Sequence, residues 1–325
     1  MATLVLTPEE VRVLLPMGEC IEAVAAALGT RARGGANNPL RRALRLPGGR
    51  IIGTMPGSLD EPESLGLKVV GVFPQNHGTQ YDAHQGIVML LDPENGVPQV
   101  ILDASAVTAI RTAAASAVAT RLLANEDAGD LALIGSGVQG HTHLEAMRCV
   151  RDIKRVRVFS ASPHKREAFA ERTGAEAVAS AREAVEGADI VCTTTSSPEP
   201  VVEGAWLAPG CHVNAVGACV PEARELDSEA MARARLYTDS TESLENESGG
   251  FLIAVKEGAI GNDHLIGEIG DVLIGKAPGR GAANEITLFE SLGIAVEDLA
   301  AAQLVYQKAR AQGVGVEVEL GGLRP

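Results

Sequence analysis

The sequence predicts an α/β protein of two parts, a mainly antiparallel α+β region followed by a doubly wound parallel sheet. Two observations carry this prediction. Short strands joined by tight turns fill the chain up to residue 102, and strands alternate with helices from residue 131 onward. A chain of 325 residues also exceeds what one hydrophobic core usually serves, so two domains are expected.

The first region begins with Thr7-Pro8-Glu9-Glu10, a capping-box pattern with proline at the first helical position, which predicts a helix there. A second helix is expected over residues 18–33, where apolar residues recur at helical spacing. Strands are expected near residues 40–46, 50–55, 66–73, 86–91 and 97–102. Pro47-Gly48-Gly49 and Asn95-Gly96 supply the turns of a mainly antiparallel sheet.

The second region follows an alanine-rich helix expected over residues 104–123. Buried strands are expected at 131–134, 156–159, 189–193, 212–216 and 235–238, with helical segments between them. This alternation is typical of a doubly wound parallel sheet. A last long helix, from about residue 296 to 310, is expected to pack back on the first region.

The strand at 131–134 runs directly into Gly135, Gly137 and Gly140, spaced as Gly-x-Gly-x-x-Gly, and a helix is expected after them. In this context the motif predicts dinucleotide binding, because Gly135 permits the turn, Gly137 lets the backbone approach a pyrophosphate, and Gly140 lets helix and strand pack closely. The helix N-terminus then faces the phosphates. The alternative is a tight turn without a ligand.

The end of the following strand bears on which nucleotide binds. An NAD site usually places an acid there, about 20 residues past the glycines, to hold the ribose 2′-hydroxyl. This chain has no acid at that place, and instead carries Ser160, Ser162, Lys165 and Arg166. Hydroxyls and cations suit a 2′-phosphate, which favours NADPH over NADH. The alternative is a capped helix start with basic residues in solvent.

Composition narrows the partners. A formal net charge of −14 argues against nucleic acid and anionic membranes. No apolar run reaches the roughly 18 residues of a membrane span, and residues 1–10 lack a signal-peptide pattern. The five scattered cysteines form no Cys-x-x-Cys, which predicts free thiols, a cytoplasmic location and no metal site.

The chain resembles the ornithine cyclodeaminase/mu-crystallin family over nearly its whole length. Gln139 inside the glycine motif and an Arg-Thr-Ala-Ala stretch some two dozen residues before it are more specific than the glycines alone. The motifs that carry the resemblance are Pro39-Leu40-Arg41, Met55-Pro56-Gly57, Lys68, Leu91-Asp92-Pro93, Arg111-Thr112-Ala113-Ala114, Gly135-Ser136-Gly137-Val138-Gln139, and the stretches 213–217, 224–227, 267–270 and 291–298.

The resemblance implies a Rossmann-type doubly wound sheet inserted into a mainly antiparallel α+β dimerisation and substrate domain, and a homodimer. On that basis residues 1–112 form the N-terminal part of the substrate domain and residues 113–290 the dinucleotide-binding domain. Residues 291–325 return as a C-terminal helix to the first domain.

Members of this family move a hydride between nicotinamide and the α-carbon of an amino or imino acid. Arg41, Lys68 and Arg111 match the family's carboxylate and substrate contacts, and an arginine fork suits a carboxylate. Lys68 interrupts an otherwise apolar strand and can serve as proton donor to an imine nitrogen. The plainer alternatives are a surface arginine at Arg41, a snorkelling lysine at Lys68 and an interdomain ion pair at Arg111.

The resemblance also implies further contacts. His84 matches a family histidine near the substrate, and a structural histidine is the alternative. Thr193 and Thr194 end a buried strand, where they would meet the ribose or nicotinamide unless they only make strand-end hydrogen bonds. The remaining cofactor contacts expected are Arg111, Thr112, Val138, Gln139, Gly217, Cys219 and Leu292.

One departure from the family's cyclodeaminases decides the expected activity. Those enzymes would need an aspartate where this chain has Cys219, and a thiol is a poor substitute for a carboxylate acid/base. A small buried cysteine is expected there rather than a nucleophile. The sequence therefore predicts an NAD(P)H-dependent reductase of small cyclic imino acids acting on C=N bonds. An ornithine or lysine cyclodeaminase, an alanine-type dehydrogenase, and a nucleotide-dependent binding protein without catalysis are the alternatives.

Overall fold

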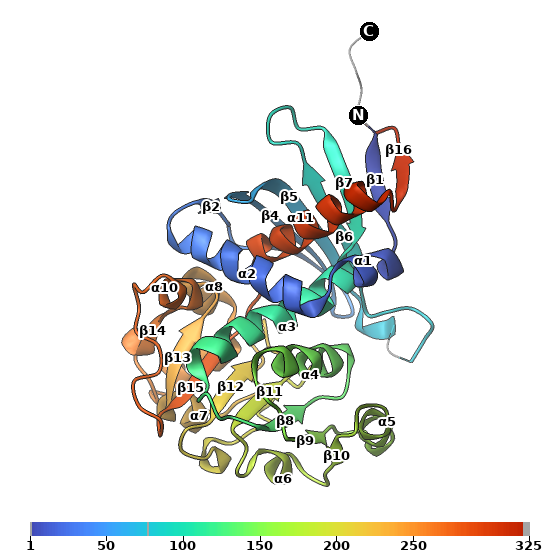
Figure 1. Ribbon diagram of the computed structural model, residues 1–325. Helices are drawn as coiled ribbons and strands as arrows, with labels where there is room; N and C mark the ends of the chain where they lie inside the picture. The colour runs from blue at the N-terminus through green and yellow to red at the C-terminus, as the bar shows by residue number, and fades with distance from the viewer. Residues whose placement is uncertain (1, 77, 321–325) are drawn as a thin grey trace. The chain divides into compact units, whose positions relative to one another are not determined.

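The computed structural model describes residues 2–76 and 78–320 (Figure 1). Within them the chain forms two compact units. One consists of the chain up to Arg111 and from Ile294 onward, and the other runs from Thr112 to Gly293. The break points differ by a few residues from the expected boundaries at 112 and 290.

The first unit is a mixed sheet with helices. Its elements are β1 (Thr3–Leu6), α1 (Pro8–Leu14), α2 (Met17–Ala32), β2 (Ala36–Asn37), β3 (Arg42–Leu46), β4 (Arg50–Asp60), β5 (Glu63–Val72), the 3-10 turn η1 (Pro74–Asn76), β6 (His84–Leu91), β7 (Pro98–Asp103), the first part of α3 (Ala104–Leu123), α11 (Ala295–Gln312) and β16 (Val316–Val318). Thr7 and Glu10 form the predicted capping box of α1, because the side chain of each accepts a hydrogen bond from the backbone of the other.

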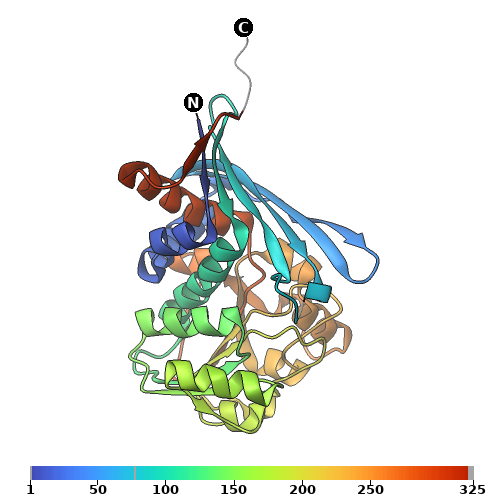
Figure 2. The ribbon, with the colours of Figure 1, turned by 90° about the vertical axis from the view of Figure 1, so that its right-hand side faces the viewer.

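The sheet of this unit runs β16-β1-β7-β6-β5-β4-β2, with β3 also paired to β4. All its pairs are antiparallel except β1 with β7, as the sequence predicts for a mainly antiparallel region. The strands β1 and β16 were not expected. Helices α2 and α11 lie side by side against one face of the sheet (Figures 1 and 2). A side-chain carbon at Gly57 would meet Ala295 and Leu299 of α11, which identifies the covered face.

The opposite face of β5, β6 and β7 is apolar and only half-buried. Because side chains alternate along a strand, residues opposite in register share a face. Leu67 pairs with Met89 and Met89 with Ile101, while Val69 pairs with Ile87. Ile87 is 41% exposed. Among the described residues, this face of the first unit is therefore apolar and partly open to solvent.

The second unit alternates strands and helices. Its elements are the rest of α3, β8 (Asp130–Ile134), α4 (Val138–Val150), β9 (Arg155–Phe159), α5 (Pro163–Thr173), β10 (Glu176–Ala177), α6 (Ala181–Val185), β11 (Ile190–Thr193), η2 (Gly204–Trp206), β12 (His212–Ala215), α7 (Ser228–Arg233), β13 (Ala234–Thr238), α8 (Thr241–Glu247), α9 (Gly249–Lys256), η3 (Asn262–His264), β14 (Leu265–Glu268), α10 (Ile269–Leu273) and β15 (Ile286–Glu290).

The strand order β10-β9-β8-β11-β12-β15-β13-β14, with every named pair parallel, defines a doubly wound sheet. The chain leaves β8 in one direction to β9 and later returns to its other side at β11. Ligands bind such sheets at this switch point, outside the carboxyl ends of the strands. The glycine motif directly follows β8, so it lies at the switch point. No helix of the described residues is long and apolar enough to cross a membrane.

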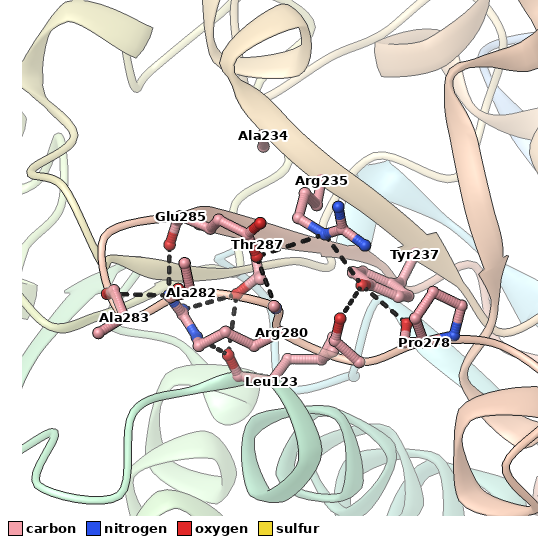
Figure 3. Close-up of polar contacts among 12 residues, drawn as sticks. Leu123, Ala234, Arg235, Tyr237, Pro278, Arg280, Ala282, Ala283, Glu285 and Thr287 are labelled. Carbon is pink, nitrogen blue, oxygen red and sulfur yellow. Dashed lines mark hydrogen bonds and ion pairs between the residues drawn. The ribbon is translucent and has the colours of Figure 1, made fainter.

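Two arginines, Arg280 and Arg151, donate hydrogen bonds to carbonyls at the C-terminal end of α3. Arg280 donates from Nε to the Leu123 carbonyl at 2.6 Å, and from Nη2 to the Gly210 carbonyl and the Thr287 hydroxyl at 3.0 Å each (Figure 3). Arg151 donates to the Thr120, Ala124 and Asn125 carbonyls at 2.9 Å each. Cationic side chains thus act as hydrogen-bond donors to the last carbonyls of α3. Positive charge is favourable there because the C-terminus is the negative end of the helix dipole.

We expect Arg280→Ala to lower stability, because it leaves the Leu123 and Gly210 carbonyls without this partner. Hydrogen bonds to charged groups are worth about 2 kcal/mol, which corresponds to a fall in Tm of roughly 4–8 °C. Differential scanning fluorimetry measures this. Arg12→Ala is the control, because Arg12 makes an exposed ion pair with Glu9 and its loss should leave Tm almost unchanged. Equal Tm values for the two variants would contradict this account of Arg280.

Candidate functional site

The glycine turn between β8 and α4 is shaped by close backbone contacts. Gly135 has φ of +121°, and a side-chain carbon on it would lie 2.5 Å from the Thr194 hydroxyl. A side-chain carbon at Gly140 would lie 2.4 Å from the Gly135 carbonyl oxygen. Both positions therefore require glycine. Helix α4 begins at Val138, three residues before the expected start, so Gln139 belongs to its first turn.

Gly137 differs from its two neighbours because it faces open space. It is the N-cap of α4 in an extended conformation, and a side-chain carbon on it would meet nothing within 4 Å. No side chain caps this helix, so its first N–H groups and its positive dipole end can receive an anion. The Gln139 Oε1 atom is buried and has no hydrogen-bond partner. These features fit the pyrophosphate of a dinucleotide.

The tip of β9 brings the predicted nucleotide-selecting residues beside the turn. Ser136 Oγ donates to Ser160 Oγ at 2.9 Å, which joins the glycine turn to the end of the second strand. Arg166 donates to the Ser160 carbonyl at 3.3 Å, and its guanidinium lies over the Phe159 ring. Ser162 precedes α5 but makes no capping hydrogen bond, so the capped-helix alternative does not use its hydroxyl. Lys165 is exposed.

The Thr193 hydroxyl makes a hydrogen bond within the protein. Its side chain is fully buried and donates to Glu225 Oε2 at 2.8 Å. Glu225 also accepts from the backbone N–H groups of Thr195 and Gly217, each at 2.6 Å. This buried carboxylate therefore ties together the chain after β11 and the chain after β12. The Thr193 hydroxyl proton is thus used within the protein, and a contact of Thr193 with the cofactor stays a prediction. Thr194 donates to the Ile134 carbonyl at 3.4 Å.

The segment after β12 holds Cys219. It is half-buried rather than buried, and its Sγ lies 3.6 Å from the Val216 carbonyl and 3.8 Å from the Ser291 carbonyl. Leu292 is buried, and its N–H donates to Asp239 at 2.8 Å. Gly217, Cys219 and Leu292 therefore come together around the carboxyl ends of β12 and β15, at the ligand edge of the sheet.

A second buried acid, Glu290, ends β15 at the same edge. Ser248 donates to its Oε1 at 2.7 Å, while its Oε2 has no hydrogen-bond partner. Burial, with the nearby charges of Glu225 and Asp239, raises its pKa to about 8. Glu290 and Glu225 line one small cavity.

We expect Glu290→Gln to gain stability over the wild type as pH rises. The folded protein keeps the Glu290 proton up to about pH 8, whereas the unfolded chain loses it near its ordinary value of 4.5. The wild type is therefore destabilised progressively between these values, and glutamine removes that effect. Tm measured at pH 5 and pH 8 tests this. A Tm difference between variant and wild type that stays constant over this range would contradict it.

In the first unit, Lys68 projects from the middle of β5 into the covered face of the sheet. It pairs with Val88 in register on β6 and is 3% exposed. Its Nζ lies 2.9 Å from Asp298 Oδ1 and 2.7 Å from Oδ2, and 3.5 Å from the Thr108 hydroxyl. The snorkelling alternative is therefore wrong, because the ammonium is buried with a carboxylate.

Arg111 joins the same cluster from α3. Its Nε donates to Asp298 Oδ1 at 2.8 Å and its Nη1 to Glu297 Oε2 at 2.7 Å. Glu297 and Asp298 are fully buried in the first turn of α11. The structure thus places Arg111 in ion pairs within its own unit. Two cations and two carboxylates form one buried cluster, which we call the Lys68 cluster: Lys68, Arg111, Glu297 and Asp298.

The pKa of Lys68 is lowered from its ordinary value to about 8. Burial is the largest cause, the positive charges of Arg111 and Arg41 act in the same direction, and the charge and hydrogen bond of Asp298 oppose them. An amine with this pKa is mostly protonated at pH 7 and can release its proton readily. Such a value suits a general acid. A buried, perturbed lysine of this kind is typical of a functional site.

Arg41 and His84 approach this cluster differently. Arg42 pairs with Thr54, so Arg41 lies one step along toward Met55, which pairs with Lys68. Arg41 is thus in the same row across the sheet, about two strand spacings from Lys68. His84 shares the face of Lys68 but lies four residues from Val88 along β6, roughly 13 Å away. It is exposed, and its carbonyl accepts from Ser105. Thr112, which is buried, begins the second unit.

The sequence prediction missed Glu225, Glu297 and Asp298 as site residues. The available signal was two adjacent acids among apolar residues at the start of the last helix, a position that buries charge unless cations meet it. By contrast, Asp227 and Glu268 have structural functions. Asp227 caps α7 by accepting from Ala230, and Glu268 accepts from the Thr241 N–H.

The fold and the open glycine turn at its switch point define a dinucleotide-binding α/β protein. The chain belongs to the ornithine cyclodeaminase/mu-crystallin family, whose model matches residues 1–313. This confirms the resemblance on which the expected site residues depend.

Individual members of known function are similar to this chain over most of its length. It is 38% identical to the ketimine reductase mu-crystallin of Mus musculus over 289 residues, 88% of this chain and 90% of the relative. It is similar to the Thermococcus litoralis Δ1-pyrroline-2-carboxylate reductase solved with NADH and L-proline, with a TM-score of 0.94, 38% identity and coverage of 97% and 100%. It is also similar to an archaeal alanine dehydrogenase dimer solved with bound NAD. The TM-score is 0.93 and the identity 34%, and the match covers 99% of this chain and 100% of the relative.

Proposed function

We propose that this protein is an NAD(P)H-dependent reductase of small α-imino acids, with cyclic ketimine carboxylates such as pyrroline- or piperideine-2-carboxylate as substrates. The observation that carries this proposal is the buried Lys68, which has a pKa of about 8 and lies within an ion-paired cluster beside Arg111 and Arg41. The names of the mouse and Thermococcus litoralis relatives, a ketimine reductase and a pyrroline-2-carboxylate reductase, support it.

Reduction of an imino acid needs a hydride at the carbon and a proton at the nitrogen. Bound NAD(P)H supplies the hydride. Lys68 gives its Nζ proton to the imine nitrogen, or holds that nitrogen protonated, so that the carbon is more electrophilic. Arg41 and Arg111 hold the substrate carboxylate. The four charges of the Lys68 cluster balance formally, so Arg41 supplies the net positive charge that attracts the carboxylate.

The second unit would hold the cofactor against Gly137 and the N-terminus of α4, with Ser160, Ser162, Lys165 and Arg166 at the adenosine ribose. Three features favour a 2′-phosphate, and hence NADPH. Ser136 and Ser160 are hydrogen-bonded to each other, the Ser162 side chain makes no capping hydrogen bond to α5, and the Arg166 guanidinium lies beside them. The Thermococcus litoralis relative was solved with NADH, so the ratio of kcat/KM for the two nucleotides decides this point.

The protein would act as a cytoplasmic homodimer through the half-buried apolar face of β5, β6 and β7. Antiparallel strands with one apolar face partly open to solvent favour association with a second copy. The archaeal alanine dehydrogenase that resembles this chain is a dimer. Light scattering on the purified protein gives the oligomeric state, and Ile87→Arg should convert a dimer to monomers.

An ornithine or lysine cyclodeaminase is the second candidate, because the family's name includes that activity. Cys219 argues against it. Its thiol faces two backbone carbonyls at the ligand edge of the sheet, and no carboxylate stands at that position.

The absorbance of reduced nicotinamide tests the proposal directly. The protein is mixed with NADPH or NADH and a panel of cyclic ketimine carboxylates, and separately with 2-oxoacids and amines. Loss of absorbance with the cyclic ketimines is expected. If the absorbance falls with none of these compounds and ammonia is released from ornithine or lysine, the protein is a cyclodeaminase and the reductase proposal is wrong. Activity confined to pyruvate with ammonia would indicate an alanine-type dehydrogenase.

A further inference from the structure

Asp298 connects the two cations that the proposed reaction needs. Lys68 lies on β5, Arg111 on α3 and Asp298 in the first turn of α11, and the two hydrogen bonds to Asp298 span 230 and 187 residues. Both Asp298 oxygens lie within 3 Å of the Lys68 Nζ atom. The same carboxylate therefore contacts the proton donor and the carboxylate-binding arginine.

Glu297 is the adjacent residue, but it contacts Arg111 rather than Lys68 through the hydrogen bond described above. It meets Arg111 Nη1 at 2.7 Å, and Lys68 is held by Asp298. Burying two carboxylates is costly unless each is paired and hydrogen-bonded. Their position at the N-terminus of α11 lowers that cost, because the helix dipole favours negative charge there. Glu297 thus pairs with Arg111, whereas Asp298 contacts both Arg111 and Lys68.

We propose that Asp298 is a positioning residue for imino-acid reduction, which holds the Lys68 ammonium protonated and directed toward the substrate nitrogen, while Glu297 orients Arg111. This inference rests on the proposed function. Asp298 does not itself contact the reacting atoms, since it acts through Lys68.

The surroundings of Lys68 explain why a carboxylate is needed. Arg111 from α3 and Arg41 from the segment before β3 both disfavour its positive charge, and so does burial. Thr108 offers one hydroxyl at 3.5 Å. Cys20 of α2 faces the same charges, but burial raises its pKa to about 12, so its thiol stays neutral. Among these groups Asp298 is the one that favours the ammonium. Without its charge, Lys68 would be largely neutral at pH 7 and would have no proton to give.

The test compares Asp298→Asn with Glu297→Gln, two isosteric changes at adjacent positions. In the wild type, kcat should fall as pH rises through the Lys68 pKa. Asp298→Asn should move this alkaline limb to lower pH by about 1–3 units, the usual effect of one close opposite charge, and should lower kcat more than it raises KM. Glu297→Gln should raise KM and leave the limb in place. Asp298→Glu should restore most of the limb.

A second readout does not need activity. The chain has six lysines, at positions 68, 154, 165, 256, 276 and 308, so 13C-labelled lysine gives few Cε resonances, and the one missing from Lys68→Met identifies Lys68. Its titration midpoint should fall in Asp298→Asn and not in Glu297→Gln. If this midpoint falls in Asp298→Asn but the wild type reduces no imino acid, the effect of Asp298 on Lys68 is supported and the proposed function is refuted.

Unchanged midpoints and unchanged pH profiles in Asp298→Asn would overturn the inference. An equal shift in Glu297→Gln would overturn it as well, because the effect would then belong to the cluster as a whole. If Asp298→Asn does not fold, the wild type still decides. A titration midpoint of Lys68 below about pH 6 in the wild type is typical of a buried lysine without an effective partner. It would contradict the inference that Asp298 keeps Lys68 protonated.

Discussion

Replacing Lys68 by methionine should lower kcat for imino-acid reduction by about 10²–10⁴, the usual contribution of a positioned general acid. Methionine keeps much of the length and apolar volume of lysine within the buried face of β5 but has no proton to donate. Binding of NAD(P)H, followed by its fluorescence, should be unchanged, because Lys68 is not among the expected cofactor contacts and the glycine turn lies in the second unit. The loss should therefore appear in single-turnover rates with saturating cofactor.

Lys308→Met is the matched control for this variant. Lys308 also pairs with a carboxylate, Glu19, at 2.7 Å, but on the surface of the first unit. Its loss should leave both Tm and kcat unchanged. The Tm of Lys68→Met must be measured as well. In that variant the buried Asp298 carboxylate keeps its ion pair with Arg111 but loses the one with Lys68, which can lower stability. If Lys68→Met and Arg111→Ala both reduced imino acids at the wild-type rate, the Lys68 cluster would not be the substrate site.

The local part of the site follows from the sequence because its signals are local. A buried strand, three glycines and a helix lie within about 20 residues, and the structure places them as β8, the turn and α4. Lys68 was recognisable because a lysine interrupting an apolar strand needs a partner. The capping box at Thr7 is read from four residues. In each case the residues that interact are near one another in the chain.

The rest depends on partners far apart in sequence. Nothing near Lys68 indicates that its carboxylate comes from Asp298, 230 residues later. Thr193 was correctly placed at a strand end, but Glu225, 32 residues away, determines where its hydroxyl points. The central strand β15 was missed because its five residues, fully buried on both faces, have no alternation that distinguishes them from a helical segment.

Gly137→Val should weaken NAD(P)H binding by about 10–100-fold without unfolding the protein. The backbone of Gly137 is extended, with φ of −83° and ψ of −165°, and a side-chain carbon there meets nothing within 4 Å, so valine is accommodated in the absence of ligand. Its methyl groups would, however, occupy the space through which a pyrophosphate reaches the N–H groups of α4. Each hydrogen bond to a charged group lost in this way is worth about 1.5–3 kcal/mol.

The choice of position makes this test selective. Valine at Gly135 would clash with Thr194, and valine at Gly140 with the Gly135 carbonyl, so a loss of binding there would not separate misfolding from a blocked site. Gly18→Ala, also in open space but on α2, is the control. It should not lower Tm, because alanine favours a helix more than glycine does, and it should leave the Kd for NAD(P)H unchanged. An unchanged Kd in a folded Gly137→Val would place the pyrophosphate elsewhere. A raised Kd with unchanged Tm means that the cofactor lies against the N-terminus of α4.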